Sequence, residues 1–379
     1  MSSFSATSSS KRKRPPSPPT PSRRMHDNTF YFDDGSIVLA ACSDYADEEK
    51  ATYVDTLGPT SSIDRSIANE ITVYFRVHRS ILVGESEVFK DMFIVGQTSA
   101  STTNAEVYDG VPLIVMQDKA EDVRGFLQAI YKPSSVFLER YDPASAKLLT
   151  SPLLLAVKYQ ADNLKDRIIE QLEADWPASD YSAWKYKREK LEAGMSGCGM
   201  CISEPVDLLQ LIRKVNMPDD SLKKLRAVAL HNMLGLPDDT YYDVDPAALD
   251  ARDCLALVAG QTKTNNLLWS WIKLEEPIPG TAADDEGPAF DDCPRCKAKM
   301  FRDELFSKWM GLSLYYPDAL VFLDMEARHI SEGHGSAAAL LCSYECRKEA
   351  EAWMDALAEE FYRKLDEIYY LIDLSDILH

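Results

Sequence analysis

The sequence lacks the features that mark membrane and secreted proteins. No stretch approaches the roughly 18 consecutive apolar residues that a membrane-spanning helix needs. The amino terminus carries no continuous apolar segment of the kind found in secretory signals. We therefore expect an intracellular protein that resides in the nucleus, the cytoplasm or both.

Motifs of the common enzyme classes are also missing. There is neither a phosphate-cradling Gly-x-x-x-x-Gly-Lys sequence nor a Gly-x-Ser-x-Gly nucleophile elbow. Gly333-His-Gly-Ser-Ala-Ala338 partly imitates a dinucleotide-binding turn, but no apolar strand leads into it. His78 is the only histidine between residues 27 and 230, and no local motif supplies it with a nucleophile or an orienting acid. We expect no catalytic residue and no cofactor-binding loop, and we interpret His78 as a structural histidine.

Acidic residues outnumber basic residues in the chain. The 379 residues include 41 Lys+Arg against 61 Asp+Glu, a formal net charge of −20. Phosphate groups attract cations, so this balance argues against direct binding to nucleic acid or to an anionic membrane. The length and the 45% of hydrophobic residues predict two globular domains.

The amino-terminal tail is basic, unlike the chain as a whole. Residues 1–24 contain six of them and no acid, among many Ser and Pro residues. Such a composition offers little apolar surface to bury, so we expect a disordered tail over residues 1–29 and order from about Phe30. Four consecutive basic residues form a compact cluster that is typical of nuclear targeting signals: Lys11, Arg12, Lys13 and Arg14.

A mixed α/β region follows the tail. β-branched and aromatic runs predict strands at residues 37–41, 71–77 and 111–116. Apolar residues at helical spacing predict helices at residues 80–93, 121–131, 151–159 and 163–176, the first of them divided by an N-cap at Ser86. The polar insert 43–70 is far longer than a hairpin loop, so it is either functional or disordered.

Two motifs in this region resemble a known family. Phe75-Arg-Val-His-Arg-Ser-Ile-Leu82 and Ser86-Glu-Val-Phe-Lys-Asp-Met-Phe93 are similar to the signature of BTB/POZ domains, and the later strand and helices follow in that family's order. The resemblance covers about residues 30–176 and is strongest to BTB proteins of mushroom-forming fungi. It is carried by Phe75, His78, Ser86, Phe89, Met92, Phe93, Tyr131, Tyr159 and Leu164.

The resemblance implies an α+β fold in which a small sheet packs against helices, and a role as a protein-interaction module. Family members associate with themselves or with related BTB chains, and some are substrate adaptors that dock onto the cullin of a ubiquitin ligase. Residues 94–105 lack the hydrophobic-x-Glu element of the cullin-binding members. The resemblance therefore favours homo- or hetero-oligomerisation, with a cullin adaptor as the alternative.

The pattern of the second half, residues 177–379, predicts an all-α region. Helical spacing of apolar residues indicates helices at 207–215, 221–234, 246–258, 265–274, 301–312 and 336–371. An acidic stretch with three prolines, residues 275–292, reads as an exposed loop. No fixed-period repeat is visible, so a solenoid is not supported.

The cysteines of this half suggest a metal site. The chain has eight cysteines, which we expect to be reduced inside a cell. Cys293 and Cys296 have zinc-knuckle spacing, and Cys342 and Cys346, one helical turn apart, would complete a four-thiolate zinc site. Such a site would fit a nuclear zinc-containing regulator, which is a further alternative.

Other interpretations of the cysteines remain open. Cys342 and Cys346 continue an apolar stripe, so they are alternatively core residues. His329 and His334 are alternative ligands. A second pair, Cys198 and Cys201, could hold a metal or form a redox disulfide.

Overall fold

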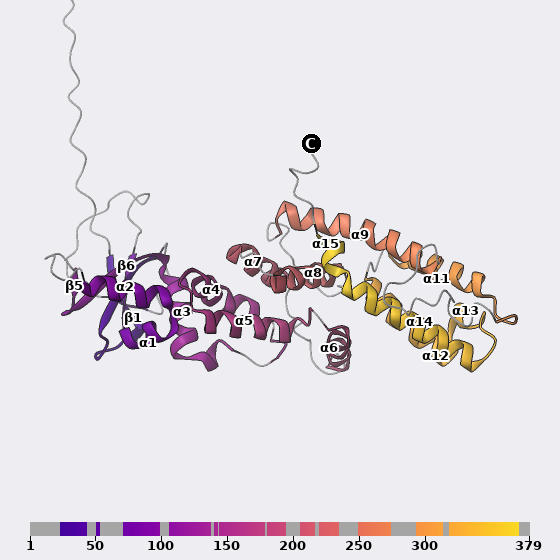
Figure 1. The fold of residues 1–379 in the computed structure, drawn as a ribbon, viewed down its shortest axis with the longest axis horizontal. Helices are drawn as coiled ribbons and strands as arrows, with labels where there is room; N and C mark the ends of the chain where they lie inside the picture. Colours follow the sequence, from indigo (N-terminus) through magenta and orange to yellow (C-terminus); the bar gives the residue numbers. More distant parts are fainter. Residues whose placement is uncertain are drawn as a thin grey trace, which may run out of the picture. The chain divides into compact units, whose positions relative to one another are not determined.

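The computed structural model describes residues 23–43, 51–53, 71–98, 106–137, 140–142, 144–178, 180–194, 205–216, 220–234, 249–273, 293–313 and 318–370. Several predictions lie outside these ranges: the basic cluster at residues 11–14, the Cys198 and Cys201 pair, the acidic loop 275–292 and most of the insert 43–70. The chain divides into two compact units, one made of Met1–Val83 and Met92–Arg124, the other of Gly84–Asp91 and Gly125–His379. Figure 1 shows strands among the early residues and helices in the later ones.

The first unit contains a mixed six-stranded sheet with the order β3-β1-β4-β2-β6-β5. β1 runs parallel to β4 and β2 runs parallel to β6, whereas the other neighbours are antiparallel. The strands predicted at residues 37–41, 71–77 and 111–116 are confirmed as β2, β4 and β6. The six strands are β1 (Arg23–Tyr31), β2 (Ile37–Ser43), β3 (Ala51–Tyr53), β4 (Ile71–Val77), β5 (Val107–Tyr108) and β6 (Val111–Lys119).

The prediction that order begins near Phe30 is wrong, because β1 starts at Arg23. Most side chains of this strand are polar or charged, so the sequence did not indicate a strand here. Its buried residues are Met25, Asp27 and Phe30. The Asp27 carboxylate is satisfied by the Arg124 guanidinium at 2.7 Å and by the backbone N–H of Phe30 at 2.9 Å. Because one of the buried positions holds a charged residue that is paired in the folded chain, β1 shows no run of apolar residues from which a strand could be predicted.

The predicted division of the first helix is confirmed. α1 (Arg79–Glu85) and α2 (Glu87–Thr98) meet at Ser86, whose hydroxyl oxygen accepts the N–H of Phe89 at 3.1 Å. The same hydroxyl donates to the backbone carbonyl of Tyr159. α3 (Ala120–Tyr131) also lies where it was predicted. The sequence therefore located both the helices and the residue that separates two of them.

Helices make up the described part of the chain after residue 131, apart from turns and connections. The fold class is α+β, with a sheet-containing domain followed by an all-α region. The helices are η1 (Pro133–Ser135), α4 (Ser145–Lys158), α5 (Asp162–Asp175), α6 (Tyr181–Gly194), α7 (Pro205–Val215), α8 (Asp220–Leu234), α9 (Ala251–Ile272), α11 (Ala298–Leu312), α12 (Ala319–Glu332), α13 (Gly335–Ala338), α14 (Tyr344–Arg363) and α15 (Leu365–Tyr369).

The structure corrects several helix boundaries in this region. The helices predicted at residues 246–258 and 265–274 form one helix, α9, whose N-cap Asp250 accepts the N–H of Asp253 at 2.7 Å. The long helix predicted over residues 336–371 is three helices, with Ser343 as the N-cap of α14. α6 and α12 were not predicted. α6 carries many charged residues, which obscure its apolar stripe. α12 has Leu320, Leu323, Ala327 and Ile330 at helical spacing, a signal that the sequence analysis missed.

The later helices share an aromatic-rich core. α12 packs along α14, and α9 contacts α15, α11 and α8 (Figure 1). Trp271, Trp309, Phe301 and Phe361 are among the fully buried side chains. No helix in the described ranges is long and apolar enough to cross a membrane.

Candidate functional sites: the cysteine cluster and the interaction domain

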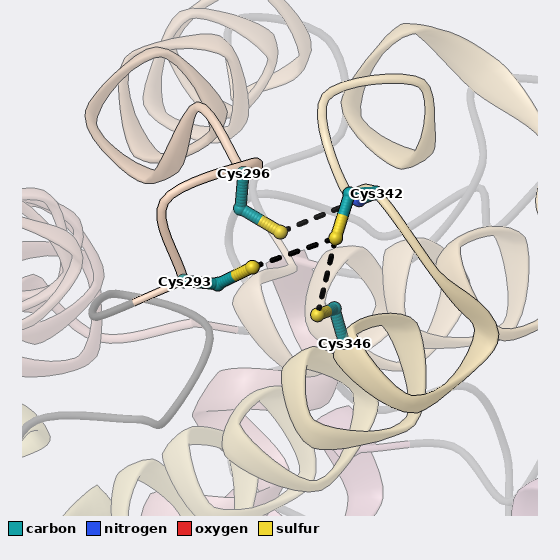
Figure 2. A group of neighbouring side chains, drawn as sticks. All are labelled: Cys293, Cys296, Cys342 and Cys346. Carbon is teal, nitrogen blue, oxygen red and sulfur yellow. Dashed lines mark hydrogen bonds between the residues drawn. The ribbon is translucent and has the colours of Figure 1, made fainter.

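Four cysteines from two distant segments meet in the helical region. Cys293 and Cys296 lie in a turn just before α11, whereas Cys342 and Cys346 lie around the start of α14. Figure 2 shows the four thiols converging on one point. The four Sγ atoms all lie within 4.8 Å of one another. The structure therefore brings together the four residues that the sequence nominated.

The local structure differs from the prediction. Cys342 and Cys346 do not share a helix face, because α14 begins at Tyr344 and Cys342 precedes its N-cap, Ser343. Cys342 is exposed, so it does not extend the buried stripe of α14, whereas Cys346 is partly buried. The alternative that these two are core residues is therefore wrong for Cys342. The loop before α14 turns the Cys342 thiol back towards Cys346.

The spacing of the sulfur atoms suits a tetrahedral ion. The Sγ of Cys342 lies 3.5 Å from that of Cys293 and 3.7 Å from that of Cys346. Zinc–sulfur bonds of about 2.3 Å in a tetrahedron place neighbouring sulfur atoms about 3.8 Å apart. Two of the sulfur–sulfur distances are thus within a few tenths of an ångström of the value for zinc coordination.

Backbone N–H groups already point at the sulfur atoms. The N–H of Cys342 donates to the Sγ of Cys296 at 3.3 Å. Hydrogen bonds from the backbone of Arg295, the thiol of Cys342 and the backbone of Cys296 lower the pKa of the Cys293 thiol to about 6. Such donors orient metal ligands and offset the charge of a thiolate.

The thiols do not share this environment equally. Burial raises the pKa of Cys296 to about 12, and the hydrogen bond with Cys293 raises the pKa of Cys342. Among these three thiols the negative charge therefore favours Cys293, while Cys296 and Cys342 favour their protonated forms. A divalent cation that took up all the thiolates would release those protons, which makes its affinity depend on pH.

Positive side chains surround the turn. Residues 293–302 contain four basic residues and no acid, although the whole chain carries a net charge of −20. Arg295, Lys297 and Lys299 are exposed, and the N–H of Lys297 donates to the carbonyl of Leu340 at 3.0 Å. One zinc ion with four thiolates carries two negative charges in sum, so these cations are a local counter-charge for such a centre.

The histidines proposed as alternative ligands lie elsewhere. The Nδ1 of His334 is 3.1 Å from a carboxylate oxygen of Glu332, and that of His329 is 3.9 Å from Glu326. Across the described ranges, the four cysteines form the only group of three or more cysteine, histidine or acidic residues with ligand atoms close enough to hold a metal ion. Cys42 and Cys254 are exposed and lie outside this group.

The residues of the suspected interaction domain divide into core and surface. Most are buried, but Met92 is 36% exposed, and the nearby Ile94 is 52% exposed. Tyr131 is partly buried. The buried residues of the signature are Phe75, Ser86, Phe89, Phe93, Tyr159 and Leu164.

His78 has a partner that the sequence analysis missed. Its Nε2 lies 3.2 Å from a carboxylate oxygen of Asp34, and its ring lies 5.1 Å from that of Phe32. The backbone carbonyl of His78 accepts the first hydrogen bonds of α1, from Ile81 and Leu82. These contacts suit a histidine that fixes the corner between β4 and α1.

The first half of the chain thus combines a small mixed sheet, a divided helix and a following helical segment, which is an α+β architecture. Residues 58–175 match the family model described as the BTB/POZ domain, so the chain contains a BTB/POZ domain. Such domains generally act as protein–protein interaction modules rather than as enzymes. The comparisons with curated proteins and with solved structures each gave no match.

Proposed function

We propose that this protein is a non-catalytic interaction module that joins copies of itself, or of related BTB chains, through its BTB/POZ domain. The match over residues 58–175 carries the proposal. It is supported by the exposed apolar side chains of Met92 and Ile94 on α2, since exposed apolar surface on an interaction domain marks contact sites.

The mass of the full chain in solution tests this proposal. We expect a dimer or a larger assembly, and we expect the double variant Met92→Glu with Ile94→Glu to weaken self-association at least tenfold, because it would place charges in an apolar contact. Leu148→Glu is the matched control, since Leu148 is another exposed apolar residue of the same domain. A monomeric wild type at micromolar concentration would contradict self-association.

Three finer roles stay predictions: docking onto a cullin, nuclear import through Lys11, Arg12, Lys13 and Arg14, and a regulatory role in the nucleus. The basic cluster and most of residues 94–105 lie outside the described residues. Co-purification with a cullin would favour the adaptor. Loss of nuclear retention on deleting residues 11–14 would favour import.

We also propose that Cys293, Cys296, Cys342 and Cys346 bind one structural zinc ion. The convergence of four thiols, the sulfur–sulfur distances and the N–H donors support it. Four protein ligands leave no open coordination position, which is the arrangement of structural rather than catalytic zinc. The ion would fasten the turn before α11 to the start of α14.

Metal analysis of the purified chain tests the site. We expect one zinc per chain, and loss of that zinc together with a lower unfolding temperature in Cys296→Ser and Cys346→Ser. Cys254→Ser is the control, because Cys254 is exposed and outside the cluster. A chain that holds no zinc when purified under reducing conditions, with all four thiols free to react, would exclude the site.

A further inference from the structure

One sulfur pair of the cysteine cluster is both close and open to solvent. The Sγ atoms of Cys293 and Cys342 lie 3.5 Å apart, which is the shorter of the two sulfur–sulfur contacts of Cys342. Cys342 is exposed and Cys293 is partly exposed, so small solutes have access to the pair. A disulfide bond is about 2.05 Å long, so these two sulfur atoms need to approach each other by only about 1.5 Å.

The surroundings favour this pair over the other close thiol. Cys346 lies in the first turn of α14, where its N–H donates to the hydroxyl oxygen of the N-cap Ser343 at 3.2 Å. Cys293 lies in a turn before α11, and Cys342 lies before α14. The side chains of Cys293 and Cys342 can therefore turn towards each other without breaking a hydrogen bond of α14. Figure 2 marks the contacts of the Cys342 thiol with both neighbours.

The charge around the pair suits cysteines that react. Arg295, Lys297 and Lys299 follow Cys293 closely and are exposed, and residues 293–302 contain no acid. The thiolate rather than the thiol is the nucleophile, so reactive cysteines typically lie in partly exposed, positively charged surroundings. Inside a cell, the disulfides that do form are usually transient and sense oxidants.

We propose that Cys293 and Cys342 form a reversible disulfide bond when hydrogen peroxide reaches the cluster, and that this bond releases the zinc ion. The proposal rests on the zinc site proposed above. A structural zinc ion of this type is held by four thiolates. The disulfide removes two of them, so only Cys296 and Cys346 are left as ligands. Zinc occupancy thereby depends on the oxidation of one pair.

The reaction balances with hydrogen peroxide as the oxidant. The Cys342 thiolate attacks one peroxide oxygen, the O–O bond breaks and hydroxide leaves, which gives a sulfenic acid at Cys342. The Cys293 thiolate then attacks that sulfur atom, the S–O bond breaks and a second hydroxide leaves. The two thiolates together lose two electrons, which the peroxide gains. The reaction oxidises only sulfur, because zinc has no redox chemistry of its own.

The disulfide bond would still connect the two segments that zinc connects. Cys293 and Cys342 are 49 residues apart in the chain, and they lie just before α11 and α14. A covalent bond across such a loop restricts the unfolded chain and so favours the folded one. We therefore expect the oxidised, zinc-free chain to unfold at a higher temperature than the reduced, zinc-free chain.

Peroxide treatment of the full-length, zinc-loaded chain tests the proposal. We expect release of one zinc ion per chain to a colorimetric chelator, together with a link between Cys293 and Cys342 at least tenfold more abundant than any other link in the cluster. Dithiothreitol with added zinc should reverse both changes. Trypsin cleaves after Arg295 and so separates Cys293 from Cys296, and fragment ions distinguish Cys342 from Cys346 in the peptide that they share.

Two variants separate this bond from general oxidation. Cys254→Ser, the control, should release zinc at the wild-type rate, because Cys254 is exposed and outside the cluster. Cys296→Ser loses a zinc ligand but keeps the pair, so it should form the link at least as fast as the wild type. Zinc release without the link, or a link that joins mainly another pair of cysteines, would overturn the proposal.

The same measurements distinguish this inference from the zinc site on which it rests. A chain that holds no zinc but links Cys293 to Cys342 would refute the zinc site and leave the disulfide bond in place. A zinc-loaded chain that keeps its metal and forms no such link under peroxide would refute the inference and leave the zinc site in place.

Discussion

At the scale of single residues, Lys187 shows how a charge is accommodated in the interior. Its side chain is buried, its ammonium donates to the backbone carbonyl of Asp175, and it lies 4.2 Å from the ring centre of Trp176. Burial lowers the pKa of this lysine to about 8, although the negative charge of Asp175 acts in the opposite direction. This hydrogen bond and the rings of Trp176 and Tyr141 thus compensate only part of the lost hydration.

The low pKa of Lys187 predicts a pH dependence of stability. The folded chain binds this proton less tightly than the unfolded chain, so stability rises as the pH increases from about 8 to about 10.5. We expect the free energy of unfolding of wild type relative to Lys187→Met to increase by about 2 kcal/mol between pH 7.5 and pH 10. Urea denaturation followed by tryptophan fluorescence measures this difference. Parallel pH profiles for the two proteins would show that Lys187 keeps an ordinary pKa when folded.

At the scale of elements, α9 approaches α15 closely because residue 260 is glycine. A β-carbon at this position would come within 2.4 Å of the Tyr369 ring, whose hydroxyl lies 3.2 Å from the Nδ1 of the buried His231. His231 in turn lies 3.0 Å from Asp318, the N-cap of α12. One small residue therefore allows a polar contact that joins α8, α15 and α12.

This close approach predicts opposite effects for two glycine substitutions. We expect Gly260→Ala to destabilise the fold by about 1–3 kcal/mol, because overpacking against Tyr369 outweighs the helix propensity gained. Gly311→Ala on α11 is the control, since its added methyl group meets no heavy atom within 4 Å and should leave stability unchanged or slightly higher. The thermal unfolding midpoints of the two variants decide the matter. Equal midpoints would mean that the Tyr369 ring moves aside at little cost in free energy.

At the scale of the whole molecule, regular patterns in the sequence predicted a mixed α/β region followed by helices, and the resemblance to BTB/POZ domains implied the α+β fold. The β-branched and aromatic run of β4, the stripe of α3 and the cap at Ser86 are local, so a single stretch of sequence shows them. The pairing of Cys293 with Cys342 depends on the chain's path over 49 residues, and only the choice of chemically suitable ligands anticipated it. The contact of His78 with Asp34 and the burial of Asp27 beside Arg124 carry no local signal, because each joins segments through tertiary packing.

The position of β1 and β2 has a consequence for cutting the protein into fragments. The family match begins at residue 58, yet both neighbours of β4 in the sheet, β1 and β2, precede that residue. A fragment trimmed to the match would leave β4 with unpaired backbone donors and acceptors along both sides. Unpaired strand edges form hydrogen bonds with strands of other chains. We therefore expect such a fragment to aggregate more readily than the longer chain.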